Sequence, residues 1–313
     1  MRQKIVLIAL LIPIYTIAQI DSLIIENKRG LFTDQTYIIK AINNEPTFIE
    51  INKKHSQILG RNNDPKLPTE ISKTSLRLRK FGWSLMTLPG LRLWTKILYH
   101  KSTITHFKHK NAVAFTIDDG FCGEDNPDGC MLDEVRELFK SHEAHATFFV
   151  TGNHCINTHK EQVDLLLKEG HEISNHNMSD WKYNKYSSED FEYDLLRTKK
   201  VLSHYRKSPS KWYRAPFGKL SKSMQRVLKT HDMINVLPDV FAHDTFIPDP
   251  KWIAKYILKK VKPGSIILIH MPERGLREWN FEAMKLTLIG LEKKGLKVLN
   301  LSQIDMYRKT KTP

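Results

Sequence analysis

The feature that most constrains the fold is a regular alternation of short apolar runs with amphipathic segments, which begins at residue 112. Seven runs rich in β-branched and aromatic residues predict strands at residues 112–117, 146–151, 172–174, 212–216, 234–238, 265–270 and 297–301. Segments of helical periodicity lie between them, at residues 132–139, 162–168, 187–202, 222–229, 251–262 and 280–294. Such alternation predicts parallel strands joined by right-handed crossovers. The sequence therefore predicts an α/β fold, either barrel-like or doubly wound.

Capping signals place the ends of two of these helices. Ser187 is a suitable N-cap, with Asp190 three residues further on. Asp249 is a suitable N-cap for the helix that Pro250 would begin, and Pro263-Gly264 would close it.

Polar side chains cluster where the predicted strands end. These side chains are Asp118 and Asp119 after the first strand, His176 and Asp180 after the third, Arg214 on the fourth, Asp239 after the fifth and His270 on the sixth. Any one of them alone would be an ordinary turn or surface residue. Because loops at the carboxyl ends of parallel strands carry the active site in α/β folds, we expect all seven residues to share one rim.

This set of residues suits metal-assisted acid–base chemistry. One imidazole and two carboxylates can bind a divalent ion and leave positions open for water and substrate. A further carboxylate could take a proton from the water, and a histidine across the rim could give one to a leaving group.

Four segments carry these residues in a fixed order: Thr116-Ile117-Asp118-Asp119-Gly120, His176-Asn177-Met178-Ser179-Asp180, Arg214-Ala215-Pro216-Phe217-Gly218 and Leu268-Ile269-His270. In order and spacing they resemble the motifs of the polysaccharide deacetylases, carbohydrate esterase family four, over residues 112–302. That family includes chitin and peptidoglycan N-acetylglucosamine deacetylases. The resemblance implies a distorted (β/α) barrel of about seven parallel strands, preceded by an N-terminal extension.

The resemblance also implies roles in proton transfer. Asp118 would be the general base, and Arg214 would keep it ionised and oriented. Asp239 would brace Arg214, and His270 would protonate the departing amine.

Asp119 and His176 would be metal ligands by the same resemblance. The second motif of the family usually ends in histidine, whereas this chain has Asp180 there. Aspartate is a competent oxygen ligand, so we expect a divalent metal, with zinc favoured and a harder ion as the alternative.

Three further residues would contact the substrate. The backbone N–H of Phe217 would stabilise the oxyanion, and Leu268 would line the pocket for the acetyl methyl group. The family's fourth motif usually carries Asp-Trp, but residues 239–244 contain no tryptophan. Trp279 is a candidate for the wall that packs the catalytic histidine.

The predicted function is hydrolysis of acetyl groups from an N-acetylglucosamine-containing polysaccharide, chitin-like or peptidoglycan-like. One alternative is an esterase for O-acetyl groups, or a hydrolase of a small amide, on the same barrel. Another is a catalytically silent glycan-binding protein, since one fold hosts unrelated roles.

The N-terminus has the pattern of a secretory signal. Arg2 and Lys4 precede an apolar run from Ile5 to Ala18, with small residues at positions −3 and −1 of a cleavage site after Ala18. The run is short for a bilayer span, which needs about 20 apolar residues. We therefore favour cleavage of residues 1–18 over a retained anchor, and a mature chain that is secreted, periplasmic or bound to the cell envelope.

Residues 19–110 are predicted to be an extension of unassigned role, ahead of a catalytic domain at residues 111–303 and a basic tail at 304–313. The extension has β-like runs at residues 37–39 and 47–51. Its basic and aromatic segment, residues 76–99, has two interpretations: contact with a membrane or anionic envelope surface, or a helix packed on the following domain. We favour the second.

Most of the net charge of +15 belongs to the N-terminal region. Residues 1–110 contain 18 basic and 7 acidic side chains, against 31 and 27 in residues 111–313. A nucleic-acid-binding protein concentrates basic residues in its functional part. The near balance of the catalytic portion therefore argues against nucleic acid as a partner, and the polysaccharide partner is what the family resemblance implies.

Three cysteines, Cys122, Cys130 and Cys155, are too few for a disulfide scaffold and lack the spacing of a zinc site. Cys122 and Cys130 bracket a turn-rich loop. Either these two form a local disulfide or all three thiols are free.

Overall fold

The computed structural model describes residues 22–26, 36–42, 45–50, 72–86, 103–121, 126, 129–156, 158–205 and 210–309. The chain divides into two compact units, residues 1–55 and 56–313. The first unit contains an antiparallel sheet of three strands: β1 (Ser22–Glu26), β2 (Thr36–Ile42) and β3 (Glu45–Glu50). Strands β2 and β3 confirm the two β-like runs predicted in this region.

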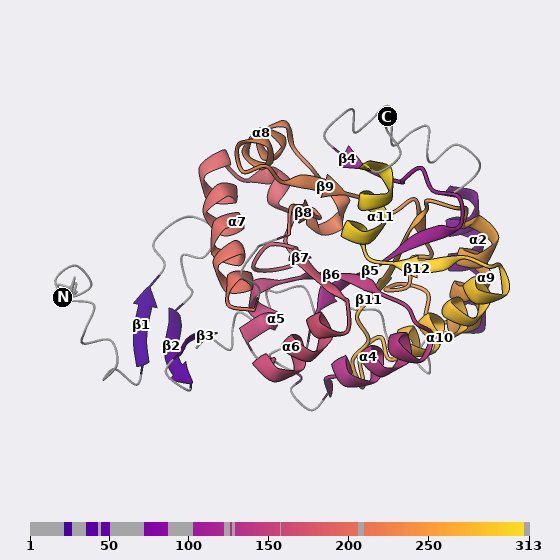
Figure 1. The fold of residues 1–313 in the computed structure, drawn as a ribbon, viewed down its shortest axis with the longest axis horizontal. Helices are drawn as coiled ribbons and strands as arrows, with labels where there is room; N and C mark the ends of the chain where they lie inside the picture. Colours follow the sequence, from indigo (N-terminus) through magenta and orange to yellow (C-terminus); the bar gives the residue numbers. More distant parts are fainter. Residues whose placement is uncertain are drawn as a thin grey trace. The chain divides into compact units, whose positions relative to one another are not determined.

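The second unit is built on a parallel sheet, and among the described residues this sheet has nine strands (Figure 1). The spatial order is β10-β11-β5-β6-β7-β8-β9-β4, and β12 pairs with β5. The strands are β4 (Thr103–Ile104), β5 (Ala112–Gly120), β6 (Ala146–Val150), β7 (Glu172–Asn175), β8 (Trp212–Tyr213), β9 (Ile234–Val236), β10 (Val240–Phe241), β11 (Ile266–His270) and β12 (Lys297–Leu299).

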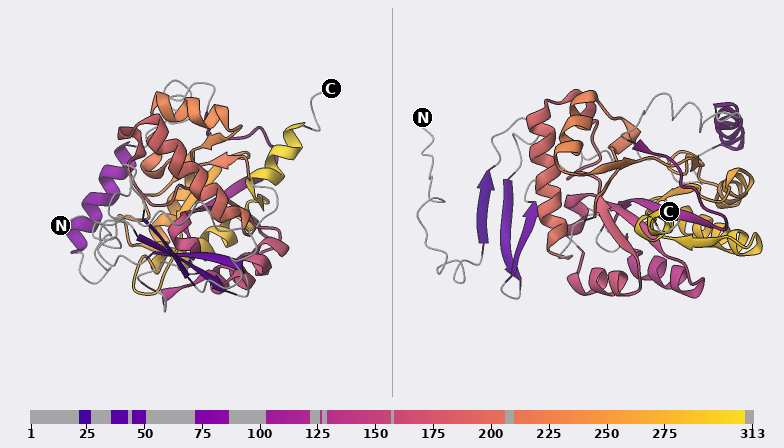
Figure 2. Two further views of the ribbon diagram at one scale, coloured as in Figure 1. Left: turned by 90° about the vertical axis from the view of Figure 1, so that its left-hand side faces the viewer. Right: turned by 45° about the horizontal axis from the view of Figure 1, so that its top comes forward.

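Helices surround this sheet, as the views in Figures 1 and 2 show. The described helices are α2 (Lys73–Met86), α4 (Leu132–Ser141), α5 (Gly152–Ile156), α6 (Lys160–Lys168), α7 (Ser188–Ser203), α8 (Lys222–Thr230), α9 (Pro250–Lys260), α10 (Trp279–Lys293) and α11 (Leu301–Lys309). Two short 3₁₀ helices, Tyr183–Lys185 and Pro216–Gly218, lie in loops after strands. The arrangement is the predicted barrel-like α/β fold, with its parallel strands and its crossover helices.

The apolar faces of the strands and helices form the core, because a parallel sheet covered by helices must bury both of its surfaces. All nine residues of β5 are buried, and Phe115, Phe139 and Phe148 are fully enclosed. Two predicted helix caps are confirmed. The Ser187 hydroxyl accepts a hydrogen bond from the Asp190 N–H at 3.1 Å, and the Asp249 carboxylate accepts one from the Trp252 N–H at 2.9 Å.

Strand β4 and helix α2 correct the predicted start of the catalytic domain at residue 111. Strand β4 pairs in parallel with β9, so residues 103–104 complete one edge of the sheet. Gly264 lies against the backbone of Phe107, just after this strand. Its φ is +83°, and an added Cβ would clash with the Phe107 carbonyl oxygen at 1.9 Å. The compact unit therefore includes segments that the sequence analysis assigned to the extension, because a two-residue strand carries too little periodicity to be recognised.

The C-terminal end also differs from the prediction. The expected basic tail at 304–313 begins inside helix α11, which starts at Leu301. Leu301 and Ile304 are fully buried against Phe107 and Trp212, and Lys211 forms an ion pair with Asp305 at 2.6 Å. Because this segment is rich in charged residues, its apolar face was not recognised in the sequence.

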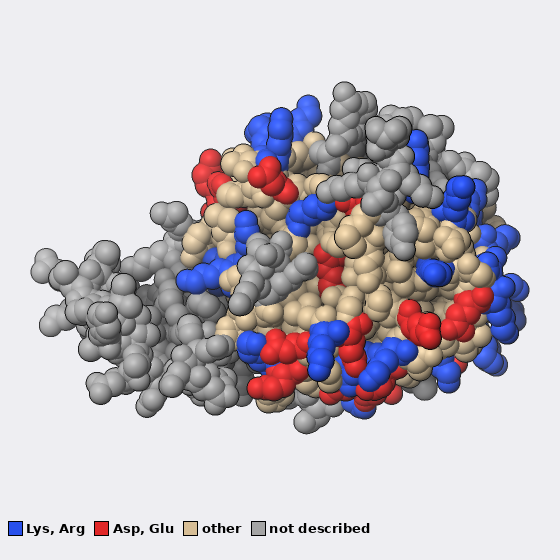
Figure 3. All heavy atoms as spheres, in the orientation of Figure 1, with Lys and Arg blue, Asp and Glu red and all other residues tan. Residues whose placement is uncertain are grey.

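The described surface carries both signs of charge. On the face drawn in Figure 3, acidic and basic side chains are interspersed, in keeping with the near balance of residues 111–313. None of the described helices is long and apolar enough to cross a membrane, and the predicted signal at residues 1–18 lies outside the described residues.

The two cysteines in the described part of the chain differ in state. Cys130 is disulfide-bonded, whereas Cys155 is free and buried. Cys122, the partner predicted for Cys130, lies outside the described residues.

Candidate active site

The carboxyl ends of the strands surround a pocket of about 610 Å³. Eight of the predicted site residues line it: Asp118, Asp119, His176, Asp180, Arg214, Phe217, Leu268 and His270. Parallel register explains the convergence, because His270 on β11 lies opposite Asp118 on β5. Neighbouring strands that end at the same level direct their next residues into one space.

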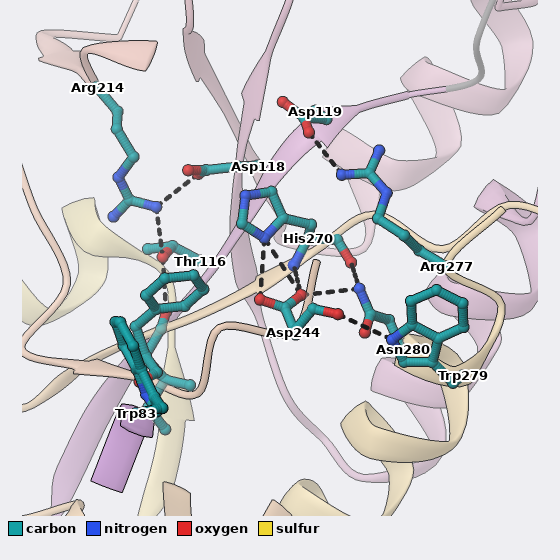
Figure 4. Close-up of polar contacts among 12 residues, drawn as sticks. Trp83, Thr116, Asp118, Asp119, Arg214, Asp244, His270, Arg277, Trp279 and Asn280 are labelled. Carbon is teal, nitrogen blue, oxygen red and sulfur yellow. Dashed lines mark hydrogen bonds and ion pairs between the residues drawn. The ribbon is translucent and has the colours of Figure 1, made fainter. Parts of the chain in front are cut away.

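Asp118 and Arg214 form a buried ion pair at the base of the pocket (Figure 4). The Nη1 of Arg214 donates to Asp118 Oδ1 at 2.6 Å and to the Thr116 hydroxyl at 2.9 Å. Its Nε donates to the Val236 carbonyl at 2.9 Å. These contacts hold the guanidinium rigidly, and the charge-assisted bond orients the Asp118 carboxylate.

Asp119, His176 and Asp180 form a cluster with the chemistry of a metal site. One ligand atom from each residue lies within 4.8 Å of the others. The Nδ1 of His176 lies 2.8 Å from the Arg214 carbonyl, which can only accept, so Nδ1 carries the proton. His176 Nε2 is therefore the lone-pair nitrogen, and it lies 3.7 Å from Asp119 Oδ1. An imidazole held through its other nitrogen is the usual arrangement of a metal-binding histidine.

A buried carboxylate on α7 holds the loop that carries His176 and Asp180. Asp194 Oδ2 accepts hydrogen bonds from the Asn177 amide at 2.6 Å and from the Met178 N–H at 3.1 Å. The Tyr213 hydroxyl donates to Asn177 Oδ1 at 2.6 Å. Asn177 has a φ of +65°, a left-handed conformation that asparagine tolerates better than most residues. These contacts fix the loop before any ligand binds.

The two carboxylates of the cluster differ in their electrostatic surroundings. Burial opposes ionisation of Asp119, but the charges of Arg277 and His270 outweigh it and hold the pKa of that carboxyl well below its usual range. Burial, followed by the neighbouring charge of Asp119, raises the pKa of Asp180 to about 8. The charges of His270 and Arg277 act in the opposite direction on Asp180 but do not outweigh these two effects.

His270 is held by Asp244, a residue to which the sequence analysis gave no role. The His270 Nδ1 lies 3.0 Å from Asp244 Oδ1, and the His270 N–H donates to Oδ2 at 2.7 Å (Figure 4). Burial would lower the pKa of His270, but Asp244 outweighs it and raises this pKa to about 9. His270 is thus protonated at neutral pH, as a general acid must be.

Two of the predicted site residues make contacts that the sequence did not indicate. Asp239 accepts hydrogen bonds from the Ile266 N–H at 2.8 Å and the Ser265 hydroxyl at 3.3 Å, so it supports the start of β11, and its bracing of Arg214 stays a prediction. Trp279 is buried and donates to the Asp244 carbonyl at 2.9 Å. The ring beside His270 is that of Phe241, with centroids 5.8 Å apart, so Phe241 is the wall expected of Trp279.

Phe217 and Leu268 both line the pocket. Phe217 lines the pocket with a φ of +56°, which is uncommon for a bulky residue, and its ring is 54% exposed. Unusual backbone conformations of this kind concentrate at functional sites. Leu268 is buried on β11 and presents an apolar side chain to the pocket.

Helix α2 supports the segment that carries Phe241 and Asp244. The Trp83 indole N–H donates to the Phe241 carbonyl at 3.1 Å, and its ring lies edge-on to His243 at 4.7 Å between centroids. Lys80 forms an ion pair with Asp249. This confirms a helix that packs on the catalytic unit within residues 76–86, while residues 87–99 lie outside the described residues. On the other side of the helix, Leu78, Phe81 and Leu85 are exposed.

We expect Trp83→Ala to lower the turnover number about 10-fold, because small displacements of positioned groups are costly to catalysis. Phe81→Ala is the matched control: it removes an aromatic ring from the exposed side of the same helix, and we expect less than about a 2-fold effect. Steady-state acetate release and melting temperature would be measured for both variants. Equal losses of turnover in the two variants would contradict the support role of Trp83.

Comparison with known proteins agrees with this geometry. Residues 106–236 match the sequence profile of the polysaccharide deacetylases. A peptidoglycan-N-acetylglucosamine deacetylase of Bacillus cereus is 29% identical over 202 residues, which span 64% of this chain and 91% of that protein. The chain thus contains a polysaccharide deacetylase domain, and the named relative is a deacetylase, a hydrolase that cleaves N-acetyl amide bonds.

Solved structures share the fold. A peptidoglycan N-acetylglucosamine deacetylase superposes with a TM-score of 0.60 at 23% identity and covers 67% of this chain and 97% of its own. A pseudoenzyme of the same family from Bacillus anthracis superposes with a TM-score of 0.57 at 21% identity, over 64% of this chain and 68% of its own. At these identities the likeness establishes the architecture alone, and activity has to be argued from the site.

Proposed function

We propose that this protein removes acetyl groups from an N-acetylglucosamine-containing polysaccharide, with peptidoglycan-like and chitin-like glycans as the candidate substrates. One observation carries the proposal: the pocket joins a carboxylate–imidazole cluster to an Asp118–Arg214 pair and a His270–Asp244 pair. A base and an acid therefore lie on one rim, at the ends of the neighbouring strands β5 and β11.

Asp119, His176 and Asp180 would hold a divalent ion, for which we propose zinc. The fit rests on the close ligand atoms and on the His176 Nε2, which carries the lone pair. A bound ion would supply a Lewis acid that polarises the acetyl carbonyl and lowers the pKa of water.

The residues of the chain account for the proton transfers. Asp118, oriented by Arg214, takes a proton from the attacking water as the new C–O bond forms. The Phe217 backbone N–H faces the developing oxyanion, and Leu268 contacts the acetyl methyl group. His270, protonated through its pairing with Asp244, donates its proton to the amine nitrogen as the C–N bond breaks. The products are acetate and a free amino sugar.

We expect a chelator to reduce acetate release from N-acetylglucosamine oligomers and peptidoglycan fragments by at least 100-fold, because the carbonyl loses its Lewis acid. Added zinc should restore the activity of the wild type but not that of His176→Ala. His142→Ala, at a surface ion pair with Glu292, is the control and should respond like the wild type.

Two results would contradict the proposed activity. Glycan binding without acetate release in the presence of zinc would indicate a silent binding protein. Faster release from O-acetylated xylan than from N-acetylated glycans would indicate an esterase. Activity that is unchanged after complete removal of metal, verified by elemental analysis, would contradict the metal requirement.

We also propose that the protein is exported to the cell envelope or secreted. The signal pattern of residues 1–18 supports this localisation. Mass spectrometry of protein recovered from the envelope or medium should find an N-terminus at Gln19. Recovery of the uncleaved chain from membranes would instead indicate a retained anchor.

A further inference from the structure

Arg277 lies next to the proposed metal cluster and has no part in the mechanism above. It is 5% exposed, and its Nη1 donates to Asp119 Oδ2 at 2.8 Å (Figure 4). The other carboxylate oxygen, Oδ1, is the one that lies 3.7 Å from His176 Nε2. The two oxygens of Asp119 therefore have different partners: one contacts a guanidinium and the other faces the cluster.

The backbone of Arg277 is held in an unusual conformation. Its φ is +54°, in the left-handed region that non-glycine residues seldom adopt, and the Asn280 N–H donates to its carbonyl at 2.8 Å. The loop before it is tied to a neighbouring segment: the Arg274 N–H donates to the Gly129 carbonyl, and Arg274 Nη1 donates to the Cys130 carbonyl, both at 2.8 Å. Such residues persist only where the surroundings over-determine them, which favours a functional role.

The charged side chains that line the pocket indicate the role of Arg277. Three carboxylates face it, those of Asp118, Asp119 and Asp180, together with two guanidiniums. Arg214 is paired with Asp118 and Arg277 with Asp119. A divalent ion in the cluster would therefore share the charge of Asp119 with Arg277. Arg277 has two opposing effects on the binding of the ion: fixing the Asp119 rotamer favours binding, and repulsion between the guanidinium and the ion opposes it. In a buried pocket the repulsion is the larger effect.

We propose that Arg277 is a positioning residue that restricts Asp119 to one ligand oxygen and weakens the binding of the ion. This inference rests on the proposed function, in which the cluster holds a divalent metal. Groups outside the ligand set orient the ligands and tune the metal. A guanidinium withdraws charge from its carboxylate, so the ion keeps more of its own charge for polarising the acetyl carbonyl. Arg277 thus favours catalysis at the expense of affinity.

The test compares zinc affinity with turnover in Arg277→Gln. Competition with a chromogenic chelator at pH 7 should give a zinc dissociation constant at least 10-fold lower than that of the wild type, while acetate release falls at least 10-fold. The zinc-induced rise in melting temperature should also be larger, because a tighter ligand stabilises the folded state more. Arg277→Lys keeps the charge, and its zinc affinity should stay within about 3-fold of the wild type.

Arg226→Gln is the matched control, since it removes an exposed arginine on α8 that does not line the pocket. Its zinc affinity and turnover should equal those of the wild type. An unchanged or weaker zinc affinity in Arg277→Gln, with normal binding by the wild type, would overturn the role of Arg277 alone. If Arg277→Gln does not fold, a change of more than 10-fold in the zinc affinity of Arg277→Lys would overturn it. Failure of the wild type to bind zinc would contradict the proposed metal function and this inference together.

Discussion

Replacing Asp118 with asparagine should lower the rate of acetate release about 10²–10⁴-fold, the usual contribution of a positioned general base. The amide keeps the shape of the side chain and can still accept a hydrogen bond from Arg214. It cannot take a proton from water at neutral pH. The loss should therefore appear in the turnover number with little change in KM, because Asp118 acts on the reacting proton.

Two controls separate this effect from damage to the fold. Asp118→Asn should bind zinc as the wild type does, since Asp118 lies outside the proposed ligand set. Asp164→Asn makes the same chemical change in a surface carboxylate on α6, which pairs with Lys160 at 2.6 Å and does not line the pocket. We expect its turnover to stay within about 3-fold of the wild type. Full activity of Asp118→Asn would remove Asp118 from the mechanism.

His270→Ala should also lose about 10²–10⁴-fold in turnover, because the amine would have to leave without a proton donor. The defect should depend on the leaving group. An aryl acetate, whose phenolate leaves without protonation, should be hydrolysed by His270→Ala within about 10-fold of the wild-type rate. An equal loss on both substrates would indicate that His270 supports the pocket and does not act as the acid.

The pH dependence provides an independent test of Asp244. With the pKa of His270 raised to about 9, the acid is protonated below that value, and activity should fall as the pH rises through it. Removing the charge in Asp244→Asn lowers this pKa, because Asp244 is what outweighs burial. The alkaline limb of kcat/KM should then move toward neutral pH, and activity at pH 8 should fall more than at pH 6. A limb that stays in place would exclude Asp244 as the source of the shift.

Most of the rim was predictable because its residues lie at strand ends, where order along the chain maps directly onto position in a parallel sheet. Asp118, Asp119, His176, Asp180, Arg214 and His270 meet in one pocket for this reason. The family resemblance implied the pairing of Asp118 with Arg214, but the partners of the other residues were not predictable. Asp239 and Asp244 lie five residues apart in the same strand-and-loop segment, and nothing in their spacing indicates which one reaches His270.

The alternation of apolar runs and helical segments was sufficient for the class of fold, since the two periodicities bury their apolar faces in only a few arrangements. Only the tertiary structure decided that Asp244 holds His270, that Arg277 holds Asp119, and that Trp83 packs beside Phe241. Each of these contacts joins residues from different parts of the chain through loops whose backbone conformation depends on long-range packing. Periodicity reports the local environment of a residue. The partner of a side chain is set by where the whole chain brings its other segments.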